Sequence, residues 1–163
     1  MTVYFIESQG ALREFSEREA PEILAIDTEY DSGTRFLPRL ALVQIAYGDE
    51  VAVIDPLQVD LTPLNAWAGG AWIAHDGSHD WWLLSEAGLV APQRPLDSQL
   101  AARLLGESRL GLGGLCEEHL GVEVDKSQQR SDWLRRPLSE KQVTYAAADA
   151  VHLLHLEALM RER

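Results

Sequence analysis

Residues 23–33 have the sequence ILAIDTEYDSG, an apolar run that predicts a strand inside a sheet but carries acidic side chains. Asp27 and Glu29 lie within the run, and a buried carboxylate costs several kcal/mol unless it is paired, hydrogen-bonded or bound to a metal. Because strand side chains alternate between faces, Asp27 and Glu29 should share one face, and Leu24, Ile26 and Thr28 the other. Two adjacent carboxylates repel each other, so we interpret this strand as a platform for a divalent cation.

An alternative for the same residues is a calcium-binding loop of the EF-hand type. Asp27, Glu29 and Asp31 have the required spacing at the first, third and fifth positions. Such a loop also needs Gly at the sixth position and Glu at the twelfth, where this chain has Ser32 and Pro38. The sequence therefore disfavours an EF-hand.

A second acidic position lies in AHDGSHDWWLL, residues 74–84. Asp80 is expected in the first turn of a helix after a strand, where a carboxylate is also common simply because it suits the helix dipole. His75 and His79 imitate the zinc motif H-E-x-x-H, which needs both histidines on one helix. The pair Gly77-Ser78 predicts a turn between strand and helix, so we expect the two histidines on different elements.

The segment VTYAAADAVHLL, residues 143–154, predicts part of a final helix. Its expected apolar stripe consists of Val143, Ala147, Ala150 and Leu154. Tyr145 and Asp149, four residues apart, should lie together on roughly the other side, where plain exposure to solvent is the alternative to a function. Oxygen ligands suit hard cations, and a pair of these about 3.5–4 Å apart serves phosphodiester cleavage. The functional interpretation therefore needs all four acids to converge.

Alternating strand and helix patterns predict an α/β fold with a mixed central sheet flanked by helices. Strands are expected over residues 2–6, 22–30, 39–47, 50–56 and 71–75, and helices over 8–20, 61–70, 78–89, 97–106, 111–121 and 139–160. Gly48-Asp49 predicts a hairpin turn, and Ser78 and Asp97 predict helix N-caps. A polar loop is expected over residues 122–137.

Composition limits the classes of protein to consider. The 163 residues, 46% of them hydrophobic, suit one domain. Cys116 is the only cysteine, which excludes an intrachain disulfide framework and suits a reducing cytoplasm. Neither a signal peptide nor an apolar stretch of about 18 residues is present, so we expect no membrane segment. The net charge of −12 argues against long-range attraction to a polyanion, although a basic segment runs from Lys126 to Lys141.

These motifs resemble the DEDD 3′–5′ exonucleases, specifically the ribonuclease D family of the DEDDy subgroup. The matching motifs are D-T-E at 27–29, H-D-G-S-H-D at 75–80 and Y-A-A-A-D at 145–149. The connecting segments L-A-L-V-Q-I (40–45), V-I-D-P (53–56), L-D-S-Q (96–99) and D-K-S-Q-Q-R-S-D-W-L-R-R-P-L (125–138) match as well. The resemblance covers nearly the whole chain. It implies a ribonuclease H-like fold and metal-dependent release of nucleoside 5′-monophosphates from RNA 3′ ends.

The resemblance also implies roles for individual residues. Asp27, Glu29, Asp80 and Asp149 would bind two Mg²⁺ or Mn²⁺ ions, and Tyr145 would position the hydrolytic water. Substrate contacts are expected at Gln44, His75, Lys126, Ser127, Arg130 and Trp133. Lys126, Ser127 and Arg130 would bind phosphates, and Trp133 would stack on a base. Simpler alternatives are a buried hydrogen bond for Gln44, a helix cap for Asp97 and core packing for Trp133.

The chain departs from the family pattern in two respects. His79 and Asp76 replace an acidic and a small residue in the second motif. The helical nucleic-acid-binding domains that follow the exonuclease domain in ribonuclease D have no counterpart in residues 1–163, which we expect to form a single exonuclease domain. With the negative charge, this predicts weak binding and a preference for single-stranded RNA 3′ ends or short oligonucleotides. The alternatives are a catalytically idle nucleic-acid-binding or scaffold module, an exonuclease acting on DNA, and a generic metal-dependent phosphatase.

Overall fold

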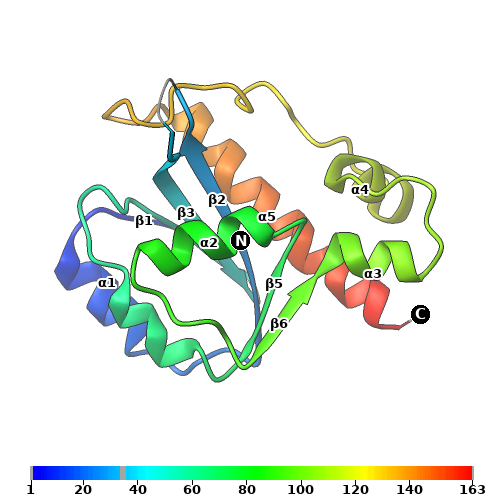
Figure 1. Cartoon of the computed structure of the whole chain (residues 1–163), viewed down its shortest axis with the longest axis horizontal. Coiled ribbons are helices and arrows are strands. Elements are labelled where there is room, and N and C mark those ends of the chain that lie inside the picture. Colours follow the sequence, from blue (N-terminus) through cyan, green and yellow to red (C-terminus); the bar gives the residue numbers. More distant parts are fainter. Residues whose placement is uncertain (1, 34–35, 163) are drawn as a thin grey trace.

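The computed structural model describes residues 2–33 and 36–162, and within these ranges six strands form one sheet (Figure 1). The strands are β1 (Thr2–Ile6), β2 (Ile23–Asp31), β3 (Arg39–Tyr47), β4 (Glu50–Ile54), β5 (Ala71–Ala74) and β6 (Arg94–Asp97). Their order across the sheet is β1-β4-β3-β2-β5-β6. Only β3 is antiparallel to its neighbours, whereas the β1–β4, β2–β5 and β5–β6 pairs are parallel. The predicted mixed sheet is thus confirmed.

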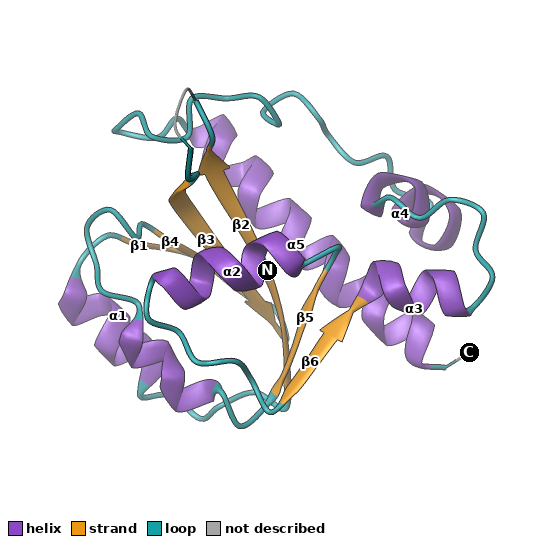
Figure 2. Ribbon diagram, in the orientation of Figure 1, coloured by secondary structure: helices purple, strands orange, loops and turns teal. Residues whose placement is uncertain are grey.

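Helices cover both faces of the sheet (Figure 2). One face packs against α1 (Gln9–Ser16), the 3₁₀ helix η1 (Thr62–Trp67) and α2 (Ser78–Glu86), and the other face packs against α5 (Glu140–Arg161). Alternation along β2 explains the division, because Leu24 and Ile26 belong to the first core and Ala25 to the second. The short helices α3 (Ser98–Leu104) and α4 (Leu112–Leu120) pack against the C-terminal half of α5.

The long helix α5 begins where the sequence predicts it. The Ser139 hydroxyl accepts a hydrogen bond from the Gln142 backbone N–H, and the Gln142 side chain accepts one from the Ser139 N–H. This capping box satisfies two groups at once that have no partner inside the helix. Buried Ala146, Ala147 and Ala150 face the sheet, and their small side chains let the helix lie close to it.

Several local predictions need correction. The strand β6 (Arg94–Asp97) was missed, because RPLD lacks an apolar run and strand pairing alone defines it as a strand. Ser78 is not an N-cap: Gly77 takes that position and no side chain caps α2. The hairpin at Gly48 is confirmed, with a φ of +50° that suits glycine. No helix in the described ranges is long and apolar enough to cross a membrane.

Candidate active site

The candidate site lies beside the second half of β2, where the pairing between β2 and β5 stops. Pairing between β2 and β5 ends at Ala25 and Ile73, although β2 continues to Asp31. After β5 the chain turns through Asp76, whose φ is +54°, and enters α2. In Figure 2 the two strands diverge beyond their paired ends. The second half of β2 is therefore open on the β5 side, at the carboxyl ends of parallel strands where ligands commonly bind in α/β sheets.

Three carboxylates converge at this opening. Oxygen atoms of Asp27, Glu29 and Asp149 all lie within 4.8 Å of one another, although Asp149 is more than a hundred positions along the chain. Asp27 and Glu29 point to the face of the sheet that α5 covers, as the alternation of the strand predicts. Asp149 comes from α5 itself. The structure thus brings together three of the four predicted metal ligands in one cluster.

The orientation of α5 agrees only in part with the prediction, because Ala147 and Ala150 of the expected apolar stripe are fully buried but the rest of the pattern differs. Tyr145 and Asp149, expected opposite the apolar stripe, are 8% and 9% exposed, and Val143 and Leu154 are only partly buried. The buried side of this helix consists of positions 142, 145, 146, 147, 149, 150, 153, 156, 157 and 160. The apolar pattern was misleading because the sheet-facing side carries the polar site residues, whereas ordinary helices keep such residues in solvent.

Asp80, the fourth acid, reaches the opening from the opposite layer. It lies in the first turn of α2, and the Thr28 hydroxyl donates a hydrogen bond to its carboxylate. Thr28 points to the α2 face of β2, between the two cluster residues on the other face. Asp80 is close enough that its charge adds to the rise in the pKa of Asp27, after the larger effect of burial. Asp80 therefore acts electrostatically on the cluster of three acids from the other face of β2.

The cluster is electrostatically unfavourable without a cation. Burial, reinforced by the neighbouring acids, raises the pKa of Glu29 to about 9. Burial also raises the pKa of Asp149 to about 6, and it moves the pKa of Asp27 well above its ordinary value and that of Asp80 upward. Oxygen-only donors that repel one another match the preference of hard divalent cations. Asp27, Glu29 and Asp149 could hold such an ion, with Asp80 beside them.

Tyr145 lies one helical turn before Asp149 on the same face of α5. Burial raises its pKa above the ordinary tyrosine value, and the charge of Asp149 adds to that effect. Against the effect of burial, a hydrogen bond from Tyr145 lowers the pKa of Asp149. The ring packs against Trp133, with centroids 5.9 Å apart. Its hydroxyl is therefore held in the protonated form beside the cluster.

Asp97 organises the turn that leads to Asp80. Its carboxylate accepts hydrogen bonds from the backbone N–H groups of Gln99 and Leu100 at the start of α3. It also accepts bonds from Asp76 and Gly77 in the turn before α2, at 3.3 and 2.9 Å. The predicted helix cap is thus confirmed, and it has a second role that the sequence did not indicate. One side chain ties the turn before α2 to the start of α3.

The two histidines of the second motif lie on different elements, as predicted, so the zinc motif is absent at this position. His75 follows β5, and its Nδ1 lies 2.8 Å from the Ser98 hydroxyl. Burial lowers the His75 pKa, which favours the neutral ring. His79 lies in α2 and packs against Tyr30, with ring centroids 4.5 Å apart. The EF-hand alternative is wrong because its first residues form a continuous strand.

Some of the predicted substrate-binding residues are exposed to solvent, and others are buried. Lys126, Ser127 and Arg130 are exposed in the loop between α4 and α5. Gln44 and Trp133 are 0% and 2% exposed, so neither offers surface to a substrate in this structure. Core packing, the alternative for Trp133, is confirmed. Gln44 is buried as the alternative proposed, but within the described residues neither end of its amide has a hydrogen-bond partner.

Two neighbours of the cluster were missed from the sequence. The Thr28 hydroxyl donates a hydrogen bond to the Asp80 carboxylate. In the sequence, only its position between Asp27 and Glu29 could have indicated that Thr28 belongs to the site. Asp125 contributes to the rise in the Asp149 pKa, behind burial. The charge of the exposed loop segment thus acts on the cluster, and the D-K-S motif at 125–127 was the corresponding signal.

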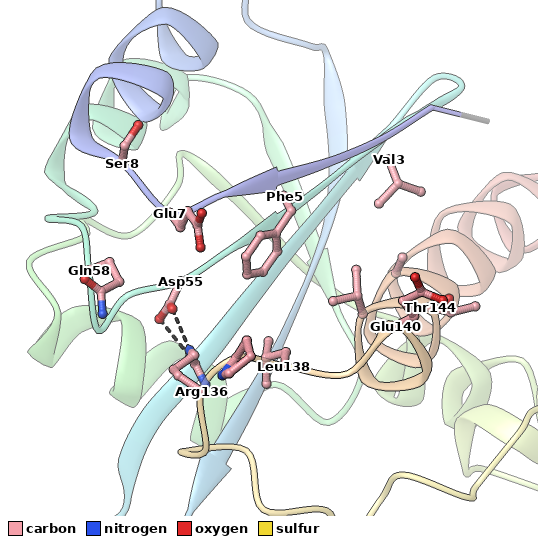
Figure 3. Close-up of a pocket in the computed structure, with 13 residues that line it drawn as sticks. Val3, Phe5, Glu7, Ser8, Asp55, Gln58, Arg136, Leu138, Glu140 and Thr144 are labelled. Carbon is pink, nitrogen blue, oxygen red and sulfur yellow. Dashed lines mark hydrogen bonds and ion pairs between the residues drawn. The ribbon is translucent and has the colours of Figure 1, made fainter.

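Two other features lie apart from this cluster. A pocket of about 920 Å³ opens between β1 and the start of α5 (Figure 3). It is lined by Val3, Phe5, Glu7, Ser8, Asp55, Gln58, Arg136, Pro137, Leu138, Glu140, Val143, Thr144 and Ala147. Its buried carboxylate, Asp55, is already paired with Arg136. A second group, Glu107, Glu118 and His119, contains a pair with His119 Nε2 and Glu107 Oε1 3.3 Å apart.

Comparison with known proteins identifies the type of domain. A family model described as 3′-5′ exonuclease matches residues 3–163. Ribonuclease D of Escherichia coli is 38% identical over 165 residues, covering 97% of this chain and 44% of that protein. Ribonuclease D of Cronobacter turicensis is 38% identical over 145 residues, covering 86% of this chain and 39% of that protein. The chain thus spans less than half the length of these curated relatives.

Solved structures agree in fold. The crystal structure of E. coli RNase D, described as an exoribonuclease involved in structured RNA processing, superposes with a TM-score of 0.92 at 35% identity. That match covers 99% of this chain and 44% of the other. Brucella melitensis NrnC bound to pGG superposes with a TM-score of 0.80 at 30% identity, covering 100% of this chain and 81% of that one. The predicted ribonuclease H-like fold is confirmed by these neighbours.

Proposed function

Because the chain belongs to the 3′-5′ exonuclease family, we propose that it removes nucleoside 5′-monophosphates from RNA 3′ ends by metal-dependent hydrolysis. The observation that carries this proposal is the convergence of Asp27, Glu29 and Asp149, whose oxygens lie within 4.8 Å of one another. Asp80 completes the four-acid set from the opposite layer. A scaffold module would retain this repulsion without using it.

The proposed cofactors are two Mg²⁺ or Mn²⁺ ions. The four acids would hold them, and the fit rests on the oxygen-only donor set and on the raised pKa values of Asp27, Glu29 and Asp149. Bound in a pair, such ions stabilise the attacking and leaving oxygens of a phosphodiester displacement. This charge compensation is also what would let all four carboxylates ionise together.

The remaining roles fall to side chains of the chain itself. The Tyr145 hydroxyl, one helical turn before Asp149 on the same face of α5, would orient the water that attacks the last phosphodiester. Thr28 would fix the carboxylate plane of Asp80. Exposed Lys126, Ser127 and Arg130 would contact phosphates of the incoming strand. Hydrolysis adds water across the P–O3′ bond, so one 5′-monophosphate leaves and a new 3′-hydroxyl remains.

Short substrates are the more plausible class. NrnC, whose match covers 100% of this chain and 81% of that one, was solved with pGG, and a net charge of −12 disfavours long-range capture of a polyanion. We therefore propose short oligonucleotides and single-stranded RNA 3′ ends as substrates. A cytoplasmic location remains a prediction from the single cysteine.

The proposal can be tested with RNA labelled at either end. With Mg²⁺ or Mn²⁺, a 5′-labelled single strand should shorten in one-nucleotide steps, and a 3′-labelled strand should release labelled mononucleotide at once. Matched RNA, DNA and dinucleotide substrates assayed in parallel would define the preferred class. EDTA should stop each reaction.

Three results would contradict the proposal. Internal cuts would indicate an endonuclease. Binding without turnover under every divalent metal would favour the idle module. Rapid hydrolysis of a simple phosphomonoester, with RNA left intact, would favour the phosphatase alternative.

A further inference from the structure

Gln44 is a buried polar side chain whose amide makes no hydrogen bond among the described residues. Gln44 is 0% exposed to solvent. Neither its Nε2 nor its Oε1 has a hydrogen-bond partner among the described residues. A buried amide left unpaired costs about 1–3 kcal/mol. Methionine or leucine would fill the same space without this cost. A nearby polar side chain that turns toward the amide when the site is used would explain why a glutamine stands here.

The sheet register identifies the nearest candidate partner. Gln44 on β3 lies directly opposite Asp27 on β2 and opposite Val53 on β4. Directly opposed residues point to the same face, with Cβ atoms about 4.5–5.5 Å apart. The next residues on this face of β3 are Leu42 and Ala46, which are apolar and buried. Of these strand neighbours, Asp27 alone has a side chain that can accept a hydrogen bond from the amide.

We propose that Gln44 is a positioning residue: its Nε2–H donates to the Asp27 carboxylate in the metal-bound protein and orients the oxygen that faces the cation. The inference rests on the proposed function, because it requires Asp27 to be a metal ligand. Partners of this kind fix the orientation of a ligating side chain, and their loss typically weakens metal binding about 10–100-fold. Gln44 then acts through Asp27 and touches no substrate.

The test replaces Gln44 and measures metal affinity and stability separately. Gln44→Met keeps the length and apolar volume of the side chain but removes the amide. Its affinity for Mn²⁺, measured by isothermal titration calorimetry, should fall roughly 10–100-fold. Its free energy of unfolding in EDTA, measured with urea, should be unchanged or higher, because an unpaired buried amide has been removed. Gln44→Asn keeps the amide on a shorter side chain. Its Mn²⁺ affinity should lie between that of the wild type and that of Gln44→Met.

The matched control is Val53→Ala, which opens a cavity beside Gln44 on the strand farther from Asp27. It should lower stability and leave Mn²⁺ affinity unchanged. Wild-type Mn²⁺ affinity in Gln44→Met would overturn the inference, whatever happens to stability. If Gln44→Met does not fold, Gln44→Asn carries the test by the same criterion. If the wild-type protein itself fails to bind Mn²⁺, the proposed function fails instead, so the two failures are distinguishable.

Discussion

At the residue scale, Asp149 links the cluster together. Its charge contributes to the raised pKa values of Asp27, Glu29 and Tyr145, in each case behind burial. Burial raises the pKa of the Cys116 thiol to about 11, and the charge of Asp149 adds to this rise. A single carboxylate thus acts on residues from β2, α4 and α5. Its removal should affect both chemistry and stability, in opposite directions.

We expect Asp149→Asn to lower the rate of RNA hydrolysis by roughly 100-fold or more, because a metal ligand is lost. The same change should raise the melting temperature in EDTA, since one of the mutually repelling carboxylates has been neutralised. Initial rates on labelled RNA and thermal unfolding would measure the two effects. Glu140→Gln, an exposed change on the same helix, serves as the control. Full activity in Asp149→Asn would contradict the proposed site.

The raised pKa values also predict a pH dependence of stability in the metal-free protein. Asp and Glu ionise near pH 4 in the unfolded chain, whereas Asp149 and Glu29 in the folded protein have pKa values of about 6 and about 9. Between about pH 4 and its folded-state pKa, each of these groups binds more protons in the folded protein than in the unfolded chain. These two residues therefore lower the free energy of unfolding as the pH rises. Stability in EDTA should therefore be higher at pH 5 than at pH 8.5.

Melting temperatures measured across this range with EDTA and with saturating Mg²⁺ would check the pH dependence. Bound Mg²⁺ should reduce the slope because it compensates the ionised carboxylates. Glu29→Gln should reduce it in EDTA as well. A melting temperature in EDTA that rises steadily from pH 5 to pH 8.5 would show that other groups dominate.

At the element scale, the site depends on how α5 and α2 present their side chains to the edge of β2. The 3.6-residue repeat of α5 places Tyr145 one turn from Asp149 on the sheet-facing side, and the capping box at Ser139 defines where that repeat begins. Helix α2 supplies Asp80 from its first turn. The two helices lie on opposite faces, so the opening in the sheet beside β2 is what lets their acids meet.

For α5, the informative change is Tyr145→Phe. It removes the hydroxyl and keeps the ring that packs on Trp133, so we expect kcat to fall roughly 100-fold. Mn²⁺ affinity and the KM for RNA should stay within about twofold, because the ligands and the strand contacts remain. Steady-state kinetics and calorimetric titration would separate these effects. A large rise in KM at constant kcat would assign Tyr145 to substrate binding instead.

For α2, the informative change is Asp97→Ala. It leaves four backbone N–H groups without their acceptor, two in the turn before α2 and two at the start of α3. We expect a loss of about 2 kcal/mol in the free energy of unfolding, measured with urea. Asp97→Asn retains one oxygen acceptor and should lose less. Equal stability of Asp97→Ala and the wild type would mean that water replaces this carboxylate without cost.

At the scale of the whole molecule, Arg136 joins the loop before α5 to the centre of the sheet. Its guanidinium donates to both Asp55 oxygens, at 2.5 and 2.7 Å, and to the Ala41 carbonyl oxygen at 2.8 Å. It also donates to the Trp133 carbonyl oxygen at 2.7 Å. Asp55 is 1% exposed. One side chain therefore satisfies a buried charge on the sheet and holds the loop that leads to the site.

Arg136→Met should lower the free energy of unfolding by roughly 3–5 kcal/mol, because it leaves the Asp55 charge buried without a partner. Urea denaturation would measure the loss. Arg135→Met, the neighbouring exposed arginine, provides the control and should stay within about 0.5 kcal/mol of the wild type. If the two variants were equally stable, the contacts of Arg136 would contribute little to the fold.

Much of the fold was predictable because local patterns are strong in this chain. The alternation in β2 placed Asp27 and Glu29 on one face, and the Gly48-Asp49 turn predicted the hairpin. The strand β6 escaped because RPLD has no strand pattern and pairing with β5 alone defines it. The orientation of α5 was predicted only in part: Ala147 and Ala150 are buried as expected. The buried side also includes Gln142, Tyr145 and Asp149, polar residues that a burial pattern assigns to solvent.

By itself, the sequence determined which residue types were available: an acidic pair on a strand, an acid at a helix start, and a tyrosine one turn before another acid. These follow from periods of two and 3.6 residues, which are local properties of the backbone. Only the tertiary structure decided that they meet. The early end of β5, the bond from Thr28 to Asp80 and the burial of Gln44 opposite Asp27 depend on contacts between distant segments, and no local repeat encodes such contacts.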